Sequence, residues 1–354
     1  MPVLVMKTHQ GVVMKRLGMA DLARAAGVSI ATVDRVLNGR EPVREDTRAQ
    51  IIAAAERIGH PAARRLSPRP VDLREIRFGV VLHKQGQDFY KAFAEALHRA
   101  VAQAPGVQGR LVLEFSSSQA PGEMAAALRA MAGRCDVLAA TAVNHPEVTA
   151  AVEELSSTGL AVFSLLSDFA QGARAGYLGL NNLKVGRTAG WFMHQTARKP
   201  GVMALFVGGH RWHGHELRET GFRGYLRECA PHLTVLDTLV NLETRQLTYE
   251  ATLNLLARQP DLRGIYVAGG GMEGAIAALR EARSAGDVAL VVSALTPESR
   301  AGLAEGLITL TVDTPLEKLC RDLMLIMTRA ATEGRGPGGL QHFLPPDLHV
   351  AESV

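Results

Sequence analysis

Cysteine is scarce in this sequence, and long apolar runs are missing. The three cysteines, Cys135, Cys229 and Cys320, form no Cys-x-x-Cys or Cys/His pair with zinc-site spacing. We therefore expect no metal and no disulfide framework, and a reducing compartment fits best. No segment reaches the roughly 18 consecutive apolar residues of a membrane span, and the apolar stretch at residues 3–6 is too short for an export signal. These observations predict a cytoplasmic protein without a membrane partner.

Common catalytic motifs are also missing. Neither Gly-x-Ser-x-Gly nor Gly-x4-Gly-Lys-[Ser/Thr] occurs, and Ser164 and Ser167 have no evident base at interpretable spacing. The length of 354 residues and the hydrophobic content of 47% suggest two or three domains with sizeable cores. We expect a binding protein that needs no cofactor, and catalysis is the minority interpretation.

The net charge of +4 is unevenly distributed. Residues 1–77 contain 14 Lys+Arg and 8 Asp+Glu, a net of +6, whereas the rest of the chain contains 25 and 27, a net of −2. A basic N-terminal part suggests a polyanionic partner for that part alone.

Apolar positions between residues 19 and 60 follow the spacing of three short helices. Gly27 is suited to the left-handed residue that ends the first helix, and Ser29 is placed to cap the second. Residues 61–77 contain three prolines and five arginines without apolar periodicity, which is typical of a linker. We predict a leader at 1–13, which is disordered or a start-site artefact, a helix-turn-helix domain at 14–59 and a hinge at 60–77.

The remaining sequence, residues 78–354, alternates short apolar runs with amphipathic helical stretches. Continuous apolar strands separated by helices indicate buried parallel sheets, and this length suggests two α/β subdomains. The predicted strands are residues 78–82, 137–140, 161–164, 202–207, 264–268 and 289–292.

The second helix of the basic part is a candidate DNA reader. A small basic three-helix unit commonly places its second helix in the major groove. Ser29 and Thr32 could bond phosphates, and Arg35 could contact guanine through two hydrogen bonds. Ile30 and Ala31 offer only apolar contacts to thymine methyls or groove shape. The alternative is a solvated helix pair with incidental charges.

The segment AxxAGVSxATVxRVLN, followed by V...TR...I..AAERIG, resembles the headpiece of the lactose-repressor (LacI) family between residues 14 and 66. The resemblance implies a transcription factor, most simply a repressor, that binds a palindromic operator as a homodimer. It also implies that Ser29, Ile30, Ala31, Thr32 and Arg35 lie on the recognition helix, that Asn38 follows, and that Leu66 is the hinge leucine of the minor groove. Two departures are Asp34 in place of serine and a hinge shortened to GHPAARRL.

The larger part resembles the effector core of the same family, which is similar to periplasmic sugar-binding proteins. The landmarks are QDFYKAF, AVNHPEV, VFSLLSD, YLGLNNLKVGRTAG, LRETGF, IYVAGGGMEGAIAAL and TVDTP. The resemblance implies two doubly wound parallel-sheet subdomains, at about 78–176 with 314–342 and at about 177–313 with 343–354. Three chain crossings between them would form the hinge of a closing cleft.

The effector site is expected beyond the carboxyl ends of the strands, where ligands of open α/β sheets lie. Phe89 and Tyr90 could stack on an apolar sugar face, polar side chains could bond hydroxyls, and Arg218 falls at a ligand-binding position of the family. The expected effector is sugar-like, a polyol or a sugar derivative. The candidate residues are Gln87, Asp88, Phe89, Tyr90, Asn144, Asp168, Asn182, His213, Arg218, Gly270 and Asp313.

Some polar positions usual in the family are missing from this core. Gly269, Gly270 and Gly271 replace an Asn/Asp pair, and Ala294 stands where an acidic residue is common. Either the effector is not a typical free pentose or hexose, or it approaches bare backbone there.

Two further motifs have weaker interpretations. Residues 269–274 fit Gly-x-Gly-x-x-Gly, but a close-approach loop is favoured over dinucleotide binding because the motif lies late in the chain. The His-rich stretch at 210–216 is favoured as a cleft loop, in which His213 or His215 bonds a polar or anionic effector, over a zinc or nickel site. The function alternatives are a solute-binding protein and an enzyme built on the α/β core.

Overall fold

The computed structural model describes residues 18–38, 43–62, 73–197, 199–334 and 339–354. The chain divides into two compact units, Met1–Leu73 and Arg74–Val354. Among the described residues no helix is both long and apolar enough to cross a membrane. The division falls just before the first strand, so the large unit begins a few residues earlier than the predicted residue 78.

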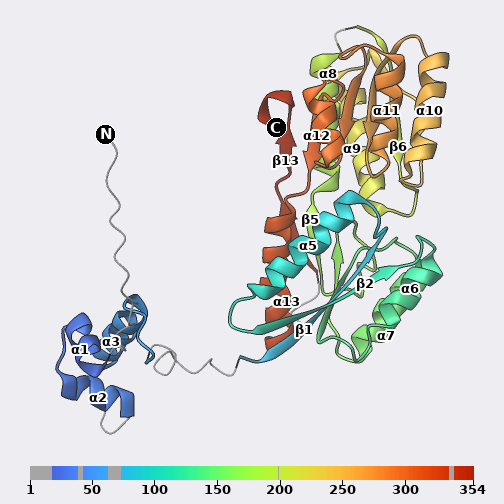
Figure 1. Ribbon diagram of the computed structural model, residues 1–354. Helices are drawn as coiled ribbons and strands as arrows, with labels where there is room; N and C mark the ends of the chain where they lie inside the picture. The colour runs from blue at the N-terminus through green and yellow to red at the C-terminus, as the bar shows by residue number, and fades with distance from the viewer. Residues whose placement is uncertain (1–17, 39–42, 63–72, 198, 335–338) are drawn as a thin grey trace, which may run out of the picture. The chain divides into compact units, whose positions relative to one another are not determined.

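The first unit contains three helices, α1 (Met19–Ala26), α2 (Ile30–Asn38) and α3 (Glu45–Arg57) (Figure 1). Leu22, Val33 and Ile51, one from each helix, are fully buried together. Gly27 ends α1 with φ of 66°, a left-handed conformation that favours glycine. The Ser29 hydroxyl accepts a hydrogen bond of 3.1 Å from the Thr32 amide. The predicted helices, their turn and the serine cap are therefore confirmed.

The first subdomain of the large unit is built on a six-stranded sheet of order β12-β5-β4-β3-β1-β2, with every pair parallel. Its strands are β1 (Glu75–His83), β2 (Gln108–Ser116), β3 (Val137–Ala140), β4 (Val162–Leu165), β5 (Gly176–Leu180) and β12 (Leu340–Leu344). Its helices are α5 (Asp88–Ala102), α6 (Pro121–Arg129), α7 (Pro146–Ser157) and α13 (Leu316–Glu333). Helices α5 and α13 pack against one another, as do α6 and α7 (Figure 1).

The side chains of β1 alternate between the two faces of the sheet, and helices cover both faces. Phe78, Val80 and Leu82 belong to the apolar cluster that includes α5 and α13, whereas Val81 belongs to the cluster of α6 and α7. Because successive side chains of a strand point to opposite faces, a continuous apolar run is buried on both sides.

The second subdomain has a sheet of order β13-β11-β10-β9-β6-β7, with β8 also pairing with β6. Its strands are β6 (Gly201–Val207), β7 (Leu233–Val235), β8 (Leu239–Val240), β9 (Leu262–Val267), β10 (Ala289–Val292), β11 (Leu310–Asp313) and β13 (Asp347–His349). Its helices are α8 (Asn182–Thr196), α9 (His213–Cys229), α10 (Arg245–Arg258), α11 (Met272–Ala282), α12 (Pro297–Ala304) and the short 3-10 helix η1 (Ala351–Ser353). Only the edge pair β11–β13 is antiparallel among the described strands.

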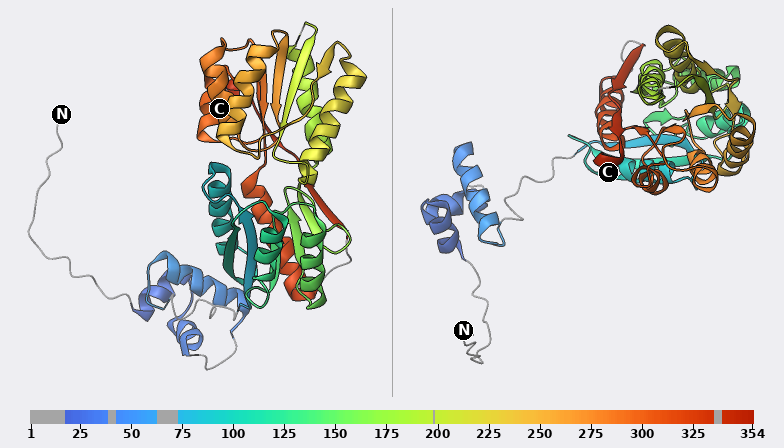
Figure 2. Two further views of the ribbon diagram at one scale, coloured as in Figure 1. Left: turned by 90° about the vertical axis from the view of Figure 1, so that its right-hand side faces the viewer. Right: turned by 90° about the horizontal axis from the view of Figure 1, so that it is seen from above.

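The two sheets form two lobes of one unit, and the chain passes between them after β5, after β11 and after β12 (Figure 2). The predicted two-subdomain parallel fold and its three crossings are thus present. The boundaries at 176/177 and 342/343 need correction, because β5 continues to Leu180 and β12 to Leu344 within the first sheet.

Candidate functional site

A cavity of about 810 Å³, counting the space at its mouth, lies between the two lobes at the carboxyl ends of their strands. This is the position that the open α/β fold predicts for a ligand. The first lobe contributes Gln87, Phe89, Tyr90, Thr141, Leu165, Leu166, Ser167 and Thr314. The second lobe contributes Asn182, Trp212, Gly214, His215, Arg218, Glu243, Gly269, Gly270, Gly271, Met272, Glu273, Ser293, Ala294 and Thr296.

Six of the residues predicted for the effector site line this cavity, namely Gln87, Phe89, Tyr90, Asn182, Arg218 and Gly270. They come from the beginnings of α5, α8 and α9 and from the loop after β9. Loops that follow parallel strands meet at one edge of each sheet, and the two edges face each other across the cavity.

The other five predicted effector residues are not among the residues that line the cavity. The carboxylate of Asp168 is buried and is held 2.7 Å from Arg174 Nη2, so its charge serves an internal ion pair. Asp313, at the end of β11, is partly buried, and burial raises the pKa of its carboxyl group above the usual value. Thr314, one residue later, lines the cavity in its place.

Asp88, Asn144 and His213 also differ from expectation. Asp88 is the first residue of α5 and pairs on the surface with Lys91, 2.9 Å away. Asn144 lines a separate shallow depression beside α7. His213 pairs at 3.2 Å with Glu216. Beside His213, the next residues Gly214 and His215 line the cavity instead.

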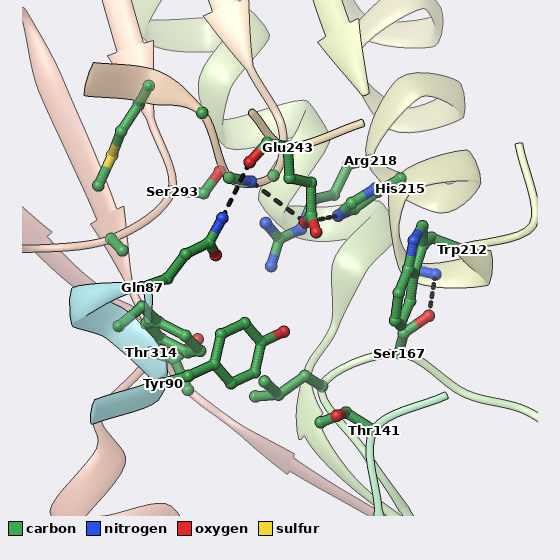
Figure 3. Close-up of a pocket in the computed structure, with 18 of the residues that line it drawn as sticks. Gln87, Tyr90, Thr141, Ser167, Trp212, His215, Arg218, Glu243, Ser293 and Thr314 are labelled. Atoms are coloured by element: carbon green, nitrogen blue, oxygen red, sulfur yellow. Dashed lines mark hydrogen bonds and ion pairs between the residues drawn. The ribbon is translucent and has the colours of Figure 1, made fainter. Parts of the chain in front are cut away.

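Arg218 is fixed on the cavity wall by two neutral acceptors. Its Nε donates to Asn182 Oδ1 at 2.7 Å and its Nη1 donates to the Ala268 carbonyl at 2.7 Å. The Asn182 amide donates in turn to the Leu166 carbonyl of the other lobe at 3.0 Å. These bonds hold the guanidinium in one orientation, with its end toward the space between Gln87 and Tyr90 (Figure 3).

Two glycines allow the helices that carry these residues to touch. A Cβ atom at Gly186 of α8 would lie 2.0 Å from the Arg218 carbonyl oxygen, and one at Gly221 of α9 would lie 2.1 Å from the Leu183 carbonyl oxygen. Only glycine permits such close backbone approach. The glycines therefore determine the depth at which Arg218 enters the cavity.

His83 organises the aromatic wall of the first lobe. The Tyr90 hydroxyl lies 3.0 Å from His83 Nε2, and His83 Nδ1 lies 3.1 Å from the Thr141 hydroxyl. The ring of Trp212, from the second lobe, stacks on His83 with centroids 4.8 Å apart. The Trp212 indole donates at 3.1 Å to Gln119 Oε1 of the first lobe. This wall therefore joins both lobes through polar and stacking contacts.

Glu243, which the sequence analysis did not single out, is the most strongly engaged polar residue of the cavity. Its buried carboxylate lies 3.2 Å from Lys84 Nζ and accepts hydrogen bonds from Gln119 Nε2 at 3.1 Å and from the Gly270 amide at 3.2 Å. Burial opposes its ionisation, but the interactions with His83 and Lys84 favour the anion, and the pKa of this carboxyl lies well below its usual value. Glu243 is therefore an anion at neutral pH.

His215 is the neutral partner in this cluster. Burial is the main cause that lowers its pKa to about 4, and the charges of Arg218, His83 and Lys84 add to that effect against the attraction of Glu243. Its Nδ1 accepts a hydrogen bond of 3.2 Å from the Gly208 amide, so the proton of the neutral ring is on Nε2. That nitrogen lies 3.7 Å from Glu243 Oε1.

The side chains of His215 and Glu243 pack directly against the backbone of the Gly269–Gly271 loop, which leaves little room for larger residues. A Cβ atom at Gly269 would lie 2.6 Å from His215 Cε1, and one at Gly270 would lie 3.0 Å from Glu243 Cβ. Gly271 has φ of 87°. The exposed backbone of this loop is thus contacted by His215 and Glu243 of the same protein. This packing agrees with the predicted close-approach loop. Among the described residues, no group of three or more His, Cys, Asp or Glu is placed to hold a metal ion.

The predicted DNA-reading residues lie on one exposed part of the first unit. Ser29, Ala31, Arg35 and Asn38 are exposed and Thr32 is partly exposed, while Ile30 has 52% of its surface accessible. The Asn38 amide donates to Asp34 Oδ1 at 2.6 Å, so the aspartate at the unusual position orients the residue that ends α2. Leu66 lies outside the described residues.

Comparison with known proteins identifies both parts. Residues 78–335 match the periplasmic binding protein domain, and residues 18–61 match the bacterial regulatory proteins of the lacI family. The chain belongs to the periplasmic-binding-protein domain family, and it has the helix-turn-helix domain of a lacI-family transcriptional regulator at its N-terminus. The predicted family resemblance and fold class are confirmed.

Curated relatives match over a short region. The HTH-type transcriptional regulator reg1 of Streptomyces lividans is 37% identical over 83 residues, 23% of this chain and 23% of that protein. The HTH-type transcriptional regulator MalR of Streptomyces coelicolor is 44% identical over 63 residues, 18% of this chain and 16% of that protein. The matches span about a quarter or less of these relatives.

Solved structures resemble the large unit at low identity. A sugar-binding protein of a sugar ABC transporter from Bacillus halodurans superposes with a TM-score of 0.69 at 18% identity, covering 78% of this chain and 98% of that one. A periplasmic solute-binding protein from Actinobacillus succinogenes, solved with D-allose, gives a TM-score of 0.70 at 16% identity, with coverage of 78% and 98%. These similarities establish the fold.

Proposed function

We propose that this protein is a cytoplasmic, ligand-responsive transcriptional regulator, most simply a repressor, that binds a two-fold operator as a homodimer. The observation that supports the proposal is the pairing, in one chain, of a lacI-family helix-turn-helix domain with a periplasmic-binding-protein core that has a polar and aromatic cavity. The protein acts by binding, without a cofactor and without turnover of its ligand.

The first unit reads DNA through α2. Ser29 and Thr32 bond phosphates at the start of the helix, and Arg35 contacts a guanine in the major groove. Ile30, with half of its surface exposed, offers an apolar contact to a thymine methyl. Leu66 of the hinge is the candidate for minor-groove contact.

The large unit senses a sugar-like effector in the cavity between its lobes. Phe89 and Tyr90 provide apolar faces for a sugar ring, while Gln87, Asn182 and Arg218 provide hydrogen bonds. Effector binding shifts the population of closed and open lobes across the three chain crossings, and the dimer transmits the change to the two hinge segments. A coupling free energy of ~1 to 3 kcal/mol changes operator affinity ~5- to 150-fold.

Selection of binding sites from random DNA with the full-length protein tests the proposal. We expect enrichment of a palindrome, and we expect Arg35→Ala to relax specificity at one position of each half-site at a cost of about 1 to 3 kcal/mol. Arg24→Ala is the matched control, because Arg24 is an exposed arginine on α1 and should leave the base preference unchanged. Failure to enrich any sequence, or an unchanged preference in Arg35→Ala, would contradict the assignment.

The enzyme alternative has its own test. We expect a compound that stabilises the protein to be recovered unchanged after prolonged incubation, as followed by NMR of the mixture. Formation of a product by the wild type, with loss of turnover on substitution of a cavity residue, would replace the purely regulatory proposal.

A further inference from the structure

Arg218 introduces a positive charge into the cavity that no carboxylate of the described residues neutralises by an ion pair. The residue is 9% exposed, and both of its hydrogen-bond acceptors, Asn182 Oδ1 and the Ala268 carbonyl, are neutral. Its Nη2 makes no hydrogen bond within the described part of the chain. A guanidinium that is nine-tenths buried, bonds only neutral acceptors and faces the cavity favours a ligand that supplies an anion.

The carboxylates that face the cavity do not fill this role. Glu243 is already engaged by Lys84, Gln119 and the Gly270 amide. Glu273 lines the cavity at the start of α11, and burial raises the pKa of its carboxyl group, with the charges of Asp88 and Glu298 in the same direction. Its surroundings therefore disfavour the charged form, which would repel an anionic ligand or compete with that ligand for Arg218.

The backbone adds positive potential at the same place. Five helices, α5, α8, α9, α11 and α12, each have a residue of their N-cap or first turn in the cavity wall. The N-terminal end of a helix has a partial positive charge and amide groups that favour anions. The close-up in Figure 3 shows the Arg218 guanidinium pointing into the space that Gln87, Tyr90 and Glu243 border.

We propose that the effector is an anionic sugar derivative whose carboxylate or phosphate pairs with the Arg218 guanidinium. This inference rests on the proposed function. The rest of the ligand contacts Phe89 and Tyr90 with its ring and Gln87 with its hydroxyls. A bidentate pair between a guanidinium and a carboxylate or phosphate is a strong and directional contact.

Matched sets of ligands test this proposal on the full-length protein. Calorimetry compares glucose, glucuronate and glucose 6-phosphate, and then galactose, galacturonate and galactose 6-phosphate, with inorganic phosphate alone as a further probe. We expect one anionic member to bind with a Kd at least tenfold lower than its neutral parent. The carboxylate and phosphate members distinguish the two sources of the anion.

Variants of Arg218 connect that preference to the residue. Arg218→Met should abolish the advantage of the anion, whereas Arg218→Lys, which keeps the charge, should retain a part of it. Thermal unfolding of each variant reports whether it folds, and if Arg218→Met does not, the salt dependence of binding in the wild type and in Arg218→Lys takes its place. Higher salt should weaken binding of the anion more than binding of its parent.

The outcomes separate this inference from the proposed function. A neutral parent that binds as tightly as its anions and releases operator DNA overturns the inference and leaves the regulator proposal standing. An anion preference that survives in Arg218→Met also overturns it. If no member of either set binds, both the sugar-like effector and its anionic form are rejected, while operator selection still tests DNA binding.

Discussion

At the scale of single residues, the cavity is organised by a carboxylate that belongs to the protein. Glu243 enters the space between the lobes with φ of 55°, in the left-handed region that non-glycine residues rarely adopt. Lys84, its partner across the cavity, has φ of 53°. Two such residues facing one another indicate that the contact between them outweighs the local backbone strain.

Glu243→Gln should destabilise the protein at neutral pH. Removal of one partner from a buried charge pair costs about 3 to 5 kcal/mol, because Lys84 then remains without its anion. Since the pKa of Glu243 is depressed in the folded state, its stabilising contribution is present above its unfolded pKa near 4.5 and is lost as the pH falls below that value. Urea unfolding at pH 7 and at lower pH measures both effects.

Glu216→Gln is the control, because Glu216 pairs with His213 at the surface and should change the free energy of unfolding by less than about 1 kcal/mol. An equal decrease in the free energy of unfolding in both variants would show that the Glu243–Lys84 pair contributes no more than a surface ion pair.

His215 should make the protein less stable in acid. Its folded pKa of about 4 lies below its usual value of 6.5, so between these values the unfolded chain binds a proton that the folded chain rejects. The free energy of unfolding should therefore fall by about 3 kcal/mol from pH 6.5 to pH 4, at 1.36 kcal/mol per pKa unit. His215→Gln should flatten this slope, and His213→Gln should retain it. A slope that survives His215→Gln would contradict the assignment.

At the scale of elements, the contact between α8 and α9 determines where Arg218 lies. Leu183 and Arg218 offer backbone oxygens to the facing helix at positions where only glycine fits, Gly221 and Gly186 respectively. The sequence contained both glycines, but a glycine inside a helical pattern does not by itself reveal which helix it faces.

Gly221→Ala should separate these helices. The new Cβ atom would meet the Leu183 carbonyl at 2.1 Å, and overpacking of this kind costs about 1 to 3 kcal/mol. Gly224→Ala, one turn later in α9, is the matched control because the nearest atoms to its Cβ lie at 3.8 Å and belong to side chains. There alanine should stabilise the helix by about 0.5 to 1 kcal/mol. Thermal unfolding of both variants checks the opposite signs.

At the scale of the whole large unit, the lobes are joined by polar contacts between distant segments. Lys84 Nζ donates to the Leu242 carbonyl at 2.6 Å, Gln87 Nε2 donates to the Glu243 carbonyl at 2.9 Å, and the Gly214 amide donates to the Ser167 hydroxyl at 3.0 Å. These bonds cross the cavity, so opening the lobes must break them. They therefore contribute to the free-energy difference between closed and open lobes, which an effector has to change.

Lys84→Met should therefore shift the large unit toward an open state. Hydrogen exchange followed by mass spectrometry should show faster exchange in residues 239–247 and 84–90, because the Lys84 bonds that hold these segments together are absent. Lys91→Met, which removes a surface pair with Asp88, should leave exchange in residues 239–247 unchanged. Equal exchange in the wild type and in Lys84→Met would mean that this contact does not control closure.

The sequence alone determined the helix-turn-helix unit and the parallel α/β architecture. Gly27, Ser29 and the helical spacing of Leu22, Val33 and Ile51 act within about 30 residues, and continuous apolar runs specify buried strands without reference to their partners. The strand ends also indicated Tyr90 and Asn182, and the family resemblance indicated Arg218, as residues of the cavity.

Only the tertiary structure decided which polar groups meet in the cavity. Lys84 and Glu243 are separated by 159 positions in the chain, and the loop that carries Glu243 contains no recognisable motif. Asp168 follows a strand, as expected for an effector-site residue, yet its carboxylate forms an ion pair with Arg174. Pairing between charges depends on the directions of side chains from different elements, which residue spacing does not encode. For that reason the architecture followed from the sequence, and the electrostatics of the site followed from the fold.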